Sequence, residues 1–190
     1  LTNSFPEYGW LSEETVDSMD RLSKSRIWIV DPIDGTKEFI HGIDEFVVSI
    51  GLVENGSPIL GVIYNPVKEE IFYSFKGEGS YMNDLQIFCN EYKSSTDMIL
   101  LISNSERREG LWNKHNKKFK SLNTIGSVAY KIALTAAGIG DTFATFRPKN
   151  EWDVCAADCI INEARGKLVT PNGKKRIYNQ KNTLIDDGLV

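Results

Sequence analysis

Residues 31–36 have the sequence Asp31-Pro32-Ile33-Asp34-Gly35-Thr36, and they follow directly on the apolar run Ile27-Trp28-Ile29-Val30. The apolar run predicts a buried strand, which the Pro and the Gly bring to an end. Two carboxylates this close repel each other unless a cation lies between them, and hard divalent ions such as Mg²⁺ bind carboxylate oxygens. The Gly and the Thr add backbone N–H groups and a hydroxyl, the donors that a phosphate needs. The stretch therefore indicates a metal site beside a phosphate site.

A second interpretation of the same six residues is simpler. Asp-Pro and Asp-Gly are common turn dipeptides, so the stretch is also typical of a strand that ends in an Asx-type turn. The spacing alone does not separate the two interpretations.

The composition limits the class of protein. A length of 190 residues fits one domain or two small halves that share a core, and 41% hydrophobic with 25% charged residues is ordinary for a globular protein. The net charge of −4 argues against a binder of nucleic-acid polymers or of membrane surfaces, whose affinity depends on clustered Lys and Arg. No apolar run approaches the roughly 20 residues of a membrane span. No signal-peptide pattern opens the sequence, so we expect a cytoplasmic protein.

The three cysteines, Cys89, Cys155 and Cys159, are too few and odd in number for a disulfide framework. Cys155 and Cys159 have helical spacing, so a helix would place both on one face. Because no further ligand lies nearby in the sequence, small buried residues are favoured over a zinc site.

The two parts of the sequence differ in their patterns. In the first part, short turns separate β-rich runs, which predicts an antiparallel meander with strands over 46–53, 59–64 and 70–75. In the second part, strands and helices alternate, which is typical of a mainly parallel or mixed sheet. The predicted strands there span 98–102, 142–146 and 167–170, and the predicted helices span 106–118, 127–137 and 152–164. The change near residues 90–97 predicts two halves, 1–95 and 96–190.

Two further acidic features could complete a metal site. Ser12-Glu13-Glu14 precedes the first predicted strand, and Trp152-Asp153 opens the last predicted helix. Taken singly, a Glu-Glu pair is usually a solvated surface, and an Asp at a helix start is usually a cap or a partner of the helix dipole.

Taken together, these motifs resemble a known family. Leu11-Ser12-Glu13-Glu14, the segment from Trp28 to Thr36, and Trp152-Asp153-Val154-Cys155-Ala156-Ala157 are similar in order and spacing to the three signatures of the inositol monophosphatase superfamily. The resemblance covers nearly the whole chain and implies a lithium-sensitive, Mg²⁺-dependent phosphomonoesterase. It also implies an α/β fold of the sugar-phosphatase type, a layered αβαβα sandwich with an α+β half at 1–95 and an α/β half at 96–190.

The resemblance implies a set of metal ligands. Glu13, Asp31 and the Ile33 carbonyl would bind one Mg²⁺. Asp31, Asp34 and Asp153 would bind a second, so that Asp31 bridges the two ions.

The resemblance also implies catalytic and substrate roles. Gly35 and Thr36 would hold the phosphate, and Thr36 with a carboxylate such as Glu13 would orient the attacking water. Gly126 and Ser127 match positions where relatives contact sugar or inositol hydroxyls, although an N-cap of the predicted helix accounts for Ser127 equally well. The implied catalytic residues are Glu13, Asp34 and Thr36.

The segment Lys37-Glu38-Phe39-Ile40 most resembles the 3'(2'),5'-bisphosphate nucleotidase branch, since members closer to the inositol phosphatases usually carry Asn before that Phe. This implies hydrolysis of 3'-phosphoadenosine 5'-phosphate, whose second phosphate would need an extra cation. Arg147 is the main candidate and Lys37 a second one, whereas the basic segment 107–120 is more typical of a solvated face. The alternatives are an inositol-phosphate or sugar-phosphate phosphatase and a truncated, inactive metal- or nucleotide-binding module. Relatives are often homodimers.

The sequence departs from the family in two places. Relatives begin with further helices and with an Asp that pairs with the threonine hydroxyl and helps to hold a third, weaker Mg²⁺. The sequence starts at Leu1, so we expect the sandwich without these helices and with one wall of the site open. Cys155 and Asp158 stand where relatives carry a small Ala and Gly, and we expect Asp158 to face solvent.

Overall fold

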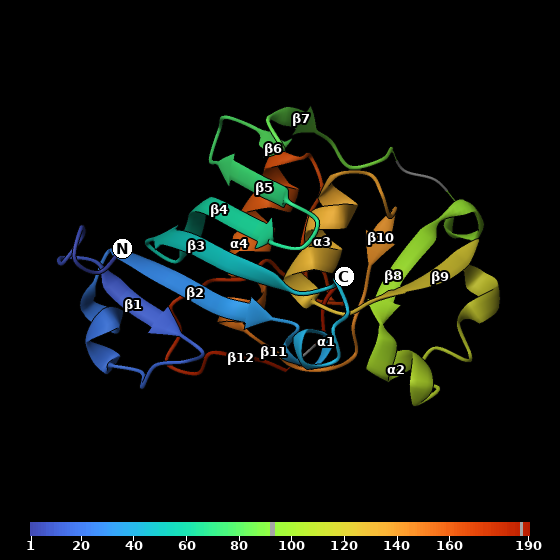
Figure 1. The fold of residues 1–190 in the computed structure, drawn as a ribbon, viewed down its shortest axis with the longest axis horizontal. Helices are drawn as coiled ribbons and strands as arrows, with labels where there is room; N and C mark the ends of the chain where they lie inside the picture. Colours follow the sequence, from blue (N-terminus) through green and yellow to red (C-terminus); the bar gives the residue numbers. More distant parts are fainter. Residues whose placement is uncertain (92–93, 187) are drawn as a thin grey trace.

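The computed structural model describes residues 1–91, 94–186 and 188–190. A seven-stranded sheet keeps its strands in chain order (Figure 1). Its first pair is parallel and every later pair is antiparallel, so the predicted meander is confirmed. The strands are β1 (Gly9–Ser12), β2 (Arg26–Asp34), β3 (Val47–Glu54), β4 (Ser57–Asn65), β5 (Glu70–Phe75), β6 (Ser80–Met82) and β7 (Leu85–Ile87).

A second, three-stranded sheet has the order β10-β8-β9 and is parallel throughout, as the alternation of strands and helices predicted. Its strands are β8 (Ile99–Ser103), β9 (Ser121–Ile125) and β10 (Thr142–Phe143). β10 is shorter than predicted because Thr145 leaves this sheet and bridges to Leu189. β11 (Lys149–Asn150) and β12 (Leu184–Ile185) form a small antiparallel pair.

The predicted helices near 127–137 and 152–164 are confirmed as α3 (Val128–Ala136) and α4 (Glu151–Glu163). They pack against each other between the two sheets, α4 on the seven-stranded sheet and α3 also on the parallel one (Figure 1). The fold is therefore a layered α/β sandwich, as expected. The remaining helical segments are short: α1 (Thr36–Ile40), α2 (Asn104–Arg108), and the 3₁₀ turns η1 (Met19–Ser23), η2 (Ser95–Asp97) and η3 (Asn116–Lys118).

The helix α4 packs closely against the sheet because two glycines face it. Gly51 on β3 and Gly61 on β4 are direct cross-strand partners. A Cβ atom at Gly51 would lie 2.8 Å from the Cys155 sulfur, and one at Gly61 would overlap the carbonyl oxygen of Ala156. Cys155 is fully buried and Cys159 is 3% exposed, so both are small core residues, as predicted. The glycines thus fix the distance between the sheet and the helix that begins at Glu151.

The helix predicted over 106–118 is wrong. α2 ends at Arg108, and Gly110 adopts a positive φ of 77° that an α-helix does not allow. The chain then folds back so that the Trp112 indole donates to Glu106 at 2.9 Å, and both side chains are buried. A buried hydrogen bond between side chains six residues apart thus takes the place of the predicted helix.

The strand predicted over 167–170 is also wrong. Val169 exchanges two backbone hydrogen bonds with Val190, but in the part of the chain that the structure describes neither residue belongs to a strand. The polar segment 171–173 turns the chain back, because the Thr170 carbonyl accepts from Gly173 and the Thr170 N–H donates to Lys174.

The expectation that Asp158 faces solvent is wrong as well. Asp158 is 5% exposed and accepts hydrogen bonds from the Tyr178 hydroxyl at 2.8 Å and from Asn162. Burial raises the pKa of Asp158 to about 6. The segment around Tyr178 covers this face of α4, which the sequence around Asp158 does not reveal.

The proposed boundary between two halves includes residues 92 and 93, which lie outside the described residues, so the division at 95/96 stays a prediction. Within the described residues, no helix is long and apolar enough to cross a bilayer.

Candidate active site

The end of β2 supplies two carboxylates. The pairing of β2 with β3 shifts register between Asp31 and Asp34, which bends the strand at that point. The Ile33 N–H donates to Asp31 Oδ1 at 2.9 Å, which is an Asx turn. Asp31 is 1% exposed and Asp34 is 8% exposed. The Asx turn of the simpler interpretation is therefore present, and it lies between two buried carboxylates.

Gly35 and Thr36 connect β2 to α1. Gly35 has a φ of 99°, and a Cβ there would meet the Glu45 carbonyl at 2.9 Å, so only glycine fits without strain. The Thr36 hydroxyl donates to the Ile33 carbonyl at 3.1 Å. This bond fixes the carbonyl that the resemblance implies as a metal ligand.

Asp34 is anchored from the second part of the chain. Its Oδ2 accepts from the Ser127 hydroxyl at 2.5 Å and from the Ala129 N–H at 2.6 Å. Ser127 is also the N-cap of α3, since its oxygen accepts from the Tyr130 N–H at 3.0 Å. Two donors therefore orient one oxygen of Asp34, and Oδ1 has no hydrogen bond within the described residues.

Asp153 occupies the first turn of α4. Its Oδ2 accepts from the Asn150 N–H at 2.8 Å and so completes a capping box. Asp153 therefore does cap the helix, which is the role that the sequence favoured when this residue was considered singly. The cap uses only Oδ2 of Asp153, so Oδ1 can belong to the cluster of carboxylates described next.

Asp31, Asp34 and Asp153 converge, each with a ligand atom within 4.8 Å of the other two. Burial first, then the charges of Asp34 and Glu13, raises the pKa of Asp31 to about 8. Burial also raises the pKa of Asp34 and of Asp153. Three converging carboxylates with raised pKa values, two of them buried and that of Asp153 half-buried, are a site of uncompensated negative charge, which a divalent cation relieves.

Glu13 directly follows β1 and lies exposed at the edge of this cluster. Partial burial and the charge of Glu14 raise its pKa, and its carboxylate interacts with that of Asp31. The structure therefore brings three of the predicted carboxylate ligands together and places the fourth carboxylate, that of Glu13, beside Asp31.

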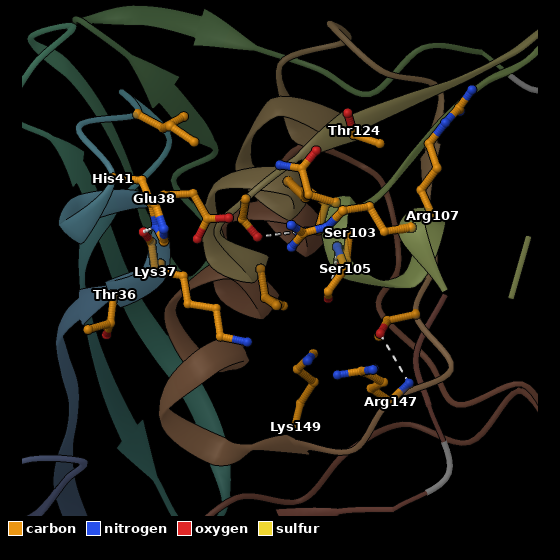
Figure 2. Close-up of a pocket in the computed structure, with 18 residues that line it drawn as sticks. Thr36, Lys37, Glu38, His41, Ser103, Ser105, Arg107, Thr124, Arg147 and Lys149 are labelled. Carbon is orange, nitrogen blue, oxygen red and sulfur yellow. Dashed lines mark hydrogen bonds between the residues drawn. The ribbon is translucent and has the colours of Figure 1, made fainter. Parts of the chain in front are cut away.

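A cavity of about 750 Å³ begins at Gly35 and Thr36, directly after Asp34 in the chain (Figure 2). The predicted substrate residues Gly35, Thr36, Gly126 and Arg147 line it. Ser127 is 1% exposed and does not line it, because its hydroxyl is directed to Asp34 and to the start of α3. A contact between Ser127 and a substrate stays a prediction.

Sequence reasoning missed several residues of this cavity. Lys149 lines it from β11, and Arg107 and Arg108, which we expected on a solvated face, line it as well. Lys131 also lines it, is fully buried, and donates to the Ile125, Gly126 and Ser127 carbonyls at 2.8, 2.7 and 2.9 Å. Lys131 is the single charged residue of the Ala-rich stretch 127–137, and that isolation was a signal available in the sequence.

Residues 1–188 match the inositol monophosphatase family. The chain belongs to this family. The resemblance that the three motifs indicated is thereby confirmed, and members of the family are phosphatases that depend on metal ions, typically Mg²⁺.

Individual relatives of this family member differ in substrate. Over 189 residues the chain is 34% identical to inositol monophosphatase 2 of Saccharomyces cerevisiae, with 90% of the chain and 64% of that protein covered. It is 28% identical over 197 residues to the 3'(2'),5'-bisphosphate nucleotidase CysQ of Haemophilus influenzae, with 100% and 73% covered. An inositol monophosphatase structure from Thermotoga maritima has a TM-score of 0.85 at 30% identity, with 99% of the chain and 70% of that protein covered. The chain thus spans about two thirds of its relatives' length, and substrate choice has to be argued from the cavity.

Proposed function

We propose that this chain carries the active site of an Mg²⁺-dependent phosphomonoesterase, which transfers the phosphoryl group of a small substrate to water. The observation that supports this is the convergence of Asp31, Asp34 and Asp153 beside Gly35 and Thr36, at the edge of a cavity lined by cations.

The donor set fits Mg²⁺. Every available ligand is an oxygen, from the carboxylates of Asp31, Asp34, Asp153 and Glu13 and from the Ile33 carbonyl. We assign Glu13, Asp31 and Ile33 to one ion, and Asp31, Asp34 and Asp153 to a second. Bound Mg²⁺ would supply Lewis-acid polarisation of the phosphoryl oxygens and a lowered pKa for water.

The protein's own groups hold the reactants. Ser127 and Ala129 fix the Asp34 carboxylate, and Asn150 fixes that of Asp153, so the ligands need little rearrangement. The N–H groups of Gly35 and Thr36 would bind phosphoryl oxygens as charge develops on them. The Thr36 hydroxyl and the Glu13 carboxylate would orient the attacking water in line with the leaving oxygen.

For the substrate we propose 3'-phosphoadenosine 5'-phosphate. Lys37-Glu38-Phe39 after the phosphate-binding residues, the nucleotidase among the relatives, and the cations Lys37, Arg147 and Lys149 in the cavity support this choice. The yeast relative supports an inositol phosphate as the second candidate.

A phosphate-release assay tests the proposal. It compares 3'-phosphoadenosine 5'-phosphate, inositol 1-phosphate and a sugar phosphate, each with and without Mg²⁺ and Li⁺. We expect Asp34→Asn and Asp153→Asn to lower Mg²⁺-dependent turnover at least about 100-fold, while circular dichroism shows an unchanged fold.

Asp97→Asn is the matched control, because Asp97 is exposed and lies outside the carboxylate cluster. Full turnover by Asp34→Asn would refute the two-ion assignment. Mg²⁺ binding by the wild-type chain without turnover of any substrate would instead favour an inactive binding module.

A further inference from the structure

A buried arginine follows the segment that begins with Glu13. Arg21 belongs to η1 and is only 2% exposed. Its guanidinium donates two hydrogen bonds to the Asp17 carboxylate, from Nε at 2.7 Å and from a terminal nitrogen at 2.8 Å. A bidentate pair of this kind fixes direction as well as distance. Because Asp17 lies four residues after Glu13, the pair holds the far end of the irregular segment that Glu13 opens.

This segment has few other anchors. Val16 is 99% exposed, so packing does not hold it. Within the described residues, the side chains of residues 13–17 make one further hydrogen bond outside the carboxylate cluster, an exposed one from the Trp10 indole to the Thr15 hydroxyl at 3.1 Å. The position of the Glu13 carboxylate therefore depends largely on the tether at Asp17.

The same guanidinium also binds a segment near the end of the chain. It donates to the Asn179 side-chain oxygen at 2.7 Å and to the Gln180 carbonyl at 3.0 Å. The Asn179 amide donates back to the Arg21 carbonyl at 3.0 Å. In Figure 1 the red segment that leads to β12 accordingly passes beside the blue segment between β1 and β2. Arg21 thus connects two segments that are 158 residues apart in the chain.

The segment 179–180 is bound in turn to the start of α4. The Glu151 carboxylate is fully buried and accepts from both backbone N–H groups of this segment, at 2.7 and 3.0 Å. Glu151 is the first residue of α4 and stands two residues before Asp153. A chain of hydrogen bonds therefore runs from the segment of Glu13, through Arg21, to the helix that carries Asp153.

We propose that Arg21 is a positioning residue of the metal site, which sets the Glu13 carboxylate relative to Asp153. It acts through Asp17 on one side and through Glu151 on the other. The inference rests on the proposed function, because it takes Glu13 and Asp153 to be ligands of the two ions. The ion assigned to Glu13 is the one affected, since Asp153 is also fixed by its own cap.

Titration calorimetry with Mg²⁺ and no substrate measures the effect on ion binding itself. Asp17→Asn is the main variant, because it weakens the tether at a side chain that is 27% exposed and leaves Arg21 its other bonds. We expect the Kd of one ion to rise about 10-fold, the lower end of the range for groups that orient metal ligands. Glu13→Gln identifies that ion, because it should raise the same Kd.

A second variant covers the case in which Asp17→Asn leaves the buried charge of Arg21 too poorly paired to fold. Asp17→Asn combined with Arg21→Met removes the charge together with its partner, which is commonly tolerated better than removal of one partner. Circular dichroism checks the fold. The double variant should raise the same Kd as Asp17→Asn.

Two controls separate positioning from a general effect. Arg26→Met breaks an exposed pair with Glu54 at the other end of β2 and should change neither Kd. Ser80→Ala loses a buried hydrogen bond to the Ile160 carbonyl on α4 and should lower Tm without changing either Kd. If Ser80→Ala raised the Kd of the Glu13 ion as much as Asp17→Asn does, loss of stability would explain the effect and the positioning role would be overturned.

The outcomes for Glu13 and Asp17 distinguish this inference from the proposed function. If Glu13→Gln raises the Kd of one ion and neither Asp17→Asn nor the double variant does, the ligand assignment stands and the positioning role is refuted. If Glu13→Gln changes no Kd, the assignment of Glu13 as a ligand fails, and the role of Arg21 fails with it.

Discussion

Gly61→Ala changes one hydrogen to a methyl group where β4 meets α4. The new Cβ would overlap the carbonyl oxygen of Ala156, which is a backbone atom and cannot rotate away. The helix or the strand must therefore move, and overpacking of this kind costs about 1–3 kcal/mol. The backbone of Gly61 has no positive φ, so the substitution also gains about 0.4–1 kcal/mol by restricting the unfolded chain.

The net effect on the free energy of unfolding is a loss of about 2 kcal/mol, because a backbone contact puts the cost at the upper end of the range. For a chain of this size, that lowers Tm by roughly 4–8 °C. Ala156 lies one turn beyond Asp153, so we also expect a higher Mg²⁺ concentration for half-maximal activity. Calorimetric melts and an Mg²⁺ titration of phosphate release measure the two effects.

Gly51→Ala provides the matched control. Its new Cβ would lie 2.8 Å from the Cys155 sulfur, which is a side-chain atom. Cys155→Ala removes that atom. In a double-mutant cycle on the free energy of unfolding, Cys155→Ala should therefore reduce the loss caused by Gly51→Ala and leave the loss caused by Gly61→Ala unchanged. On this reasoning, the backbone of α4 limits how closely β4 can approach. A wild-type Tm for Gly61→Ala would refute it, and so would equal coupling of both glycine variants to Cys155→Ala.

Three other predictions concern the site and the core. In EDTA, thermal stability should fall as pH rises from about 4 to 8, because the folded state holds a proton on Asp31, with its pKa raised from 3.8 to about 8, that the unfolded chain releases. Melts with saturating Mg²⁺ should show a shallower slope, and an equally steep slope for Asp31→Asn in EDTA would contradict the assignment. Ser127→Ala should cost about 1–2 kcal/mol as a lost cap and also weaken Mg²⁺ activation through Asp34, whereas Ser18→Ala, at the cap of η1, should leave Mg²⁺ activation unchanged. Tyr178→Phe should cost about 1–2 kcal/mol in urea unfolding because the buried Asp158 loses a donor. Tyr73→Phe, which removes an exposed hydrogen bond to Asp84, should cost much less, and equal losses would count against the buried bond.

Much of the architecture follows from local pattern. The apolar runs and short turns of the first part predicted β3, β4 and β5 to within a few residues, and the Ala-rich and Trp-Asp segments predicted α3 and α4. The convergence of Asp31, Asp34 and Asp153 followed from motif spacing together with the family resemblance.

The errors arise where distant residues meet. Glu106 binds Thr145, 39 residues further along the chain, as well as Trp112, where a helix was predicted. Tyr178 covers Asp158, which looked like a surface residue. Lys149 lines the cavity from β11, a strand whose pairing with β12 was not predicted. No local pattern encodes such contacts, since they depend on how the two sheets close around α3 and α4.

The anchoring of Asp34 by Ser127 and Ala129 links the metal site to folding itself. β2 supplies two carboxylates, α4 supplies the third, and the start of α3 holds one of them in place, so no contiguous segment contains a complete site. A cation that binds only the assembled arrangement adds its binding free energy to stability, about 2.7 kcal/mol at one hundred times Kd. Bound Mg²⁺ would therefore connect segments that are remote in the chain and stabilise their packing. The Mg²⁺ concentration around the protein would then set how firmly its sheets and helices stay together, whether or not a substrate is present.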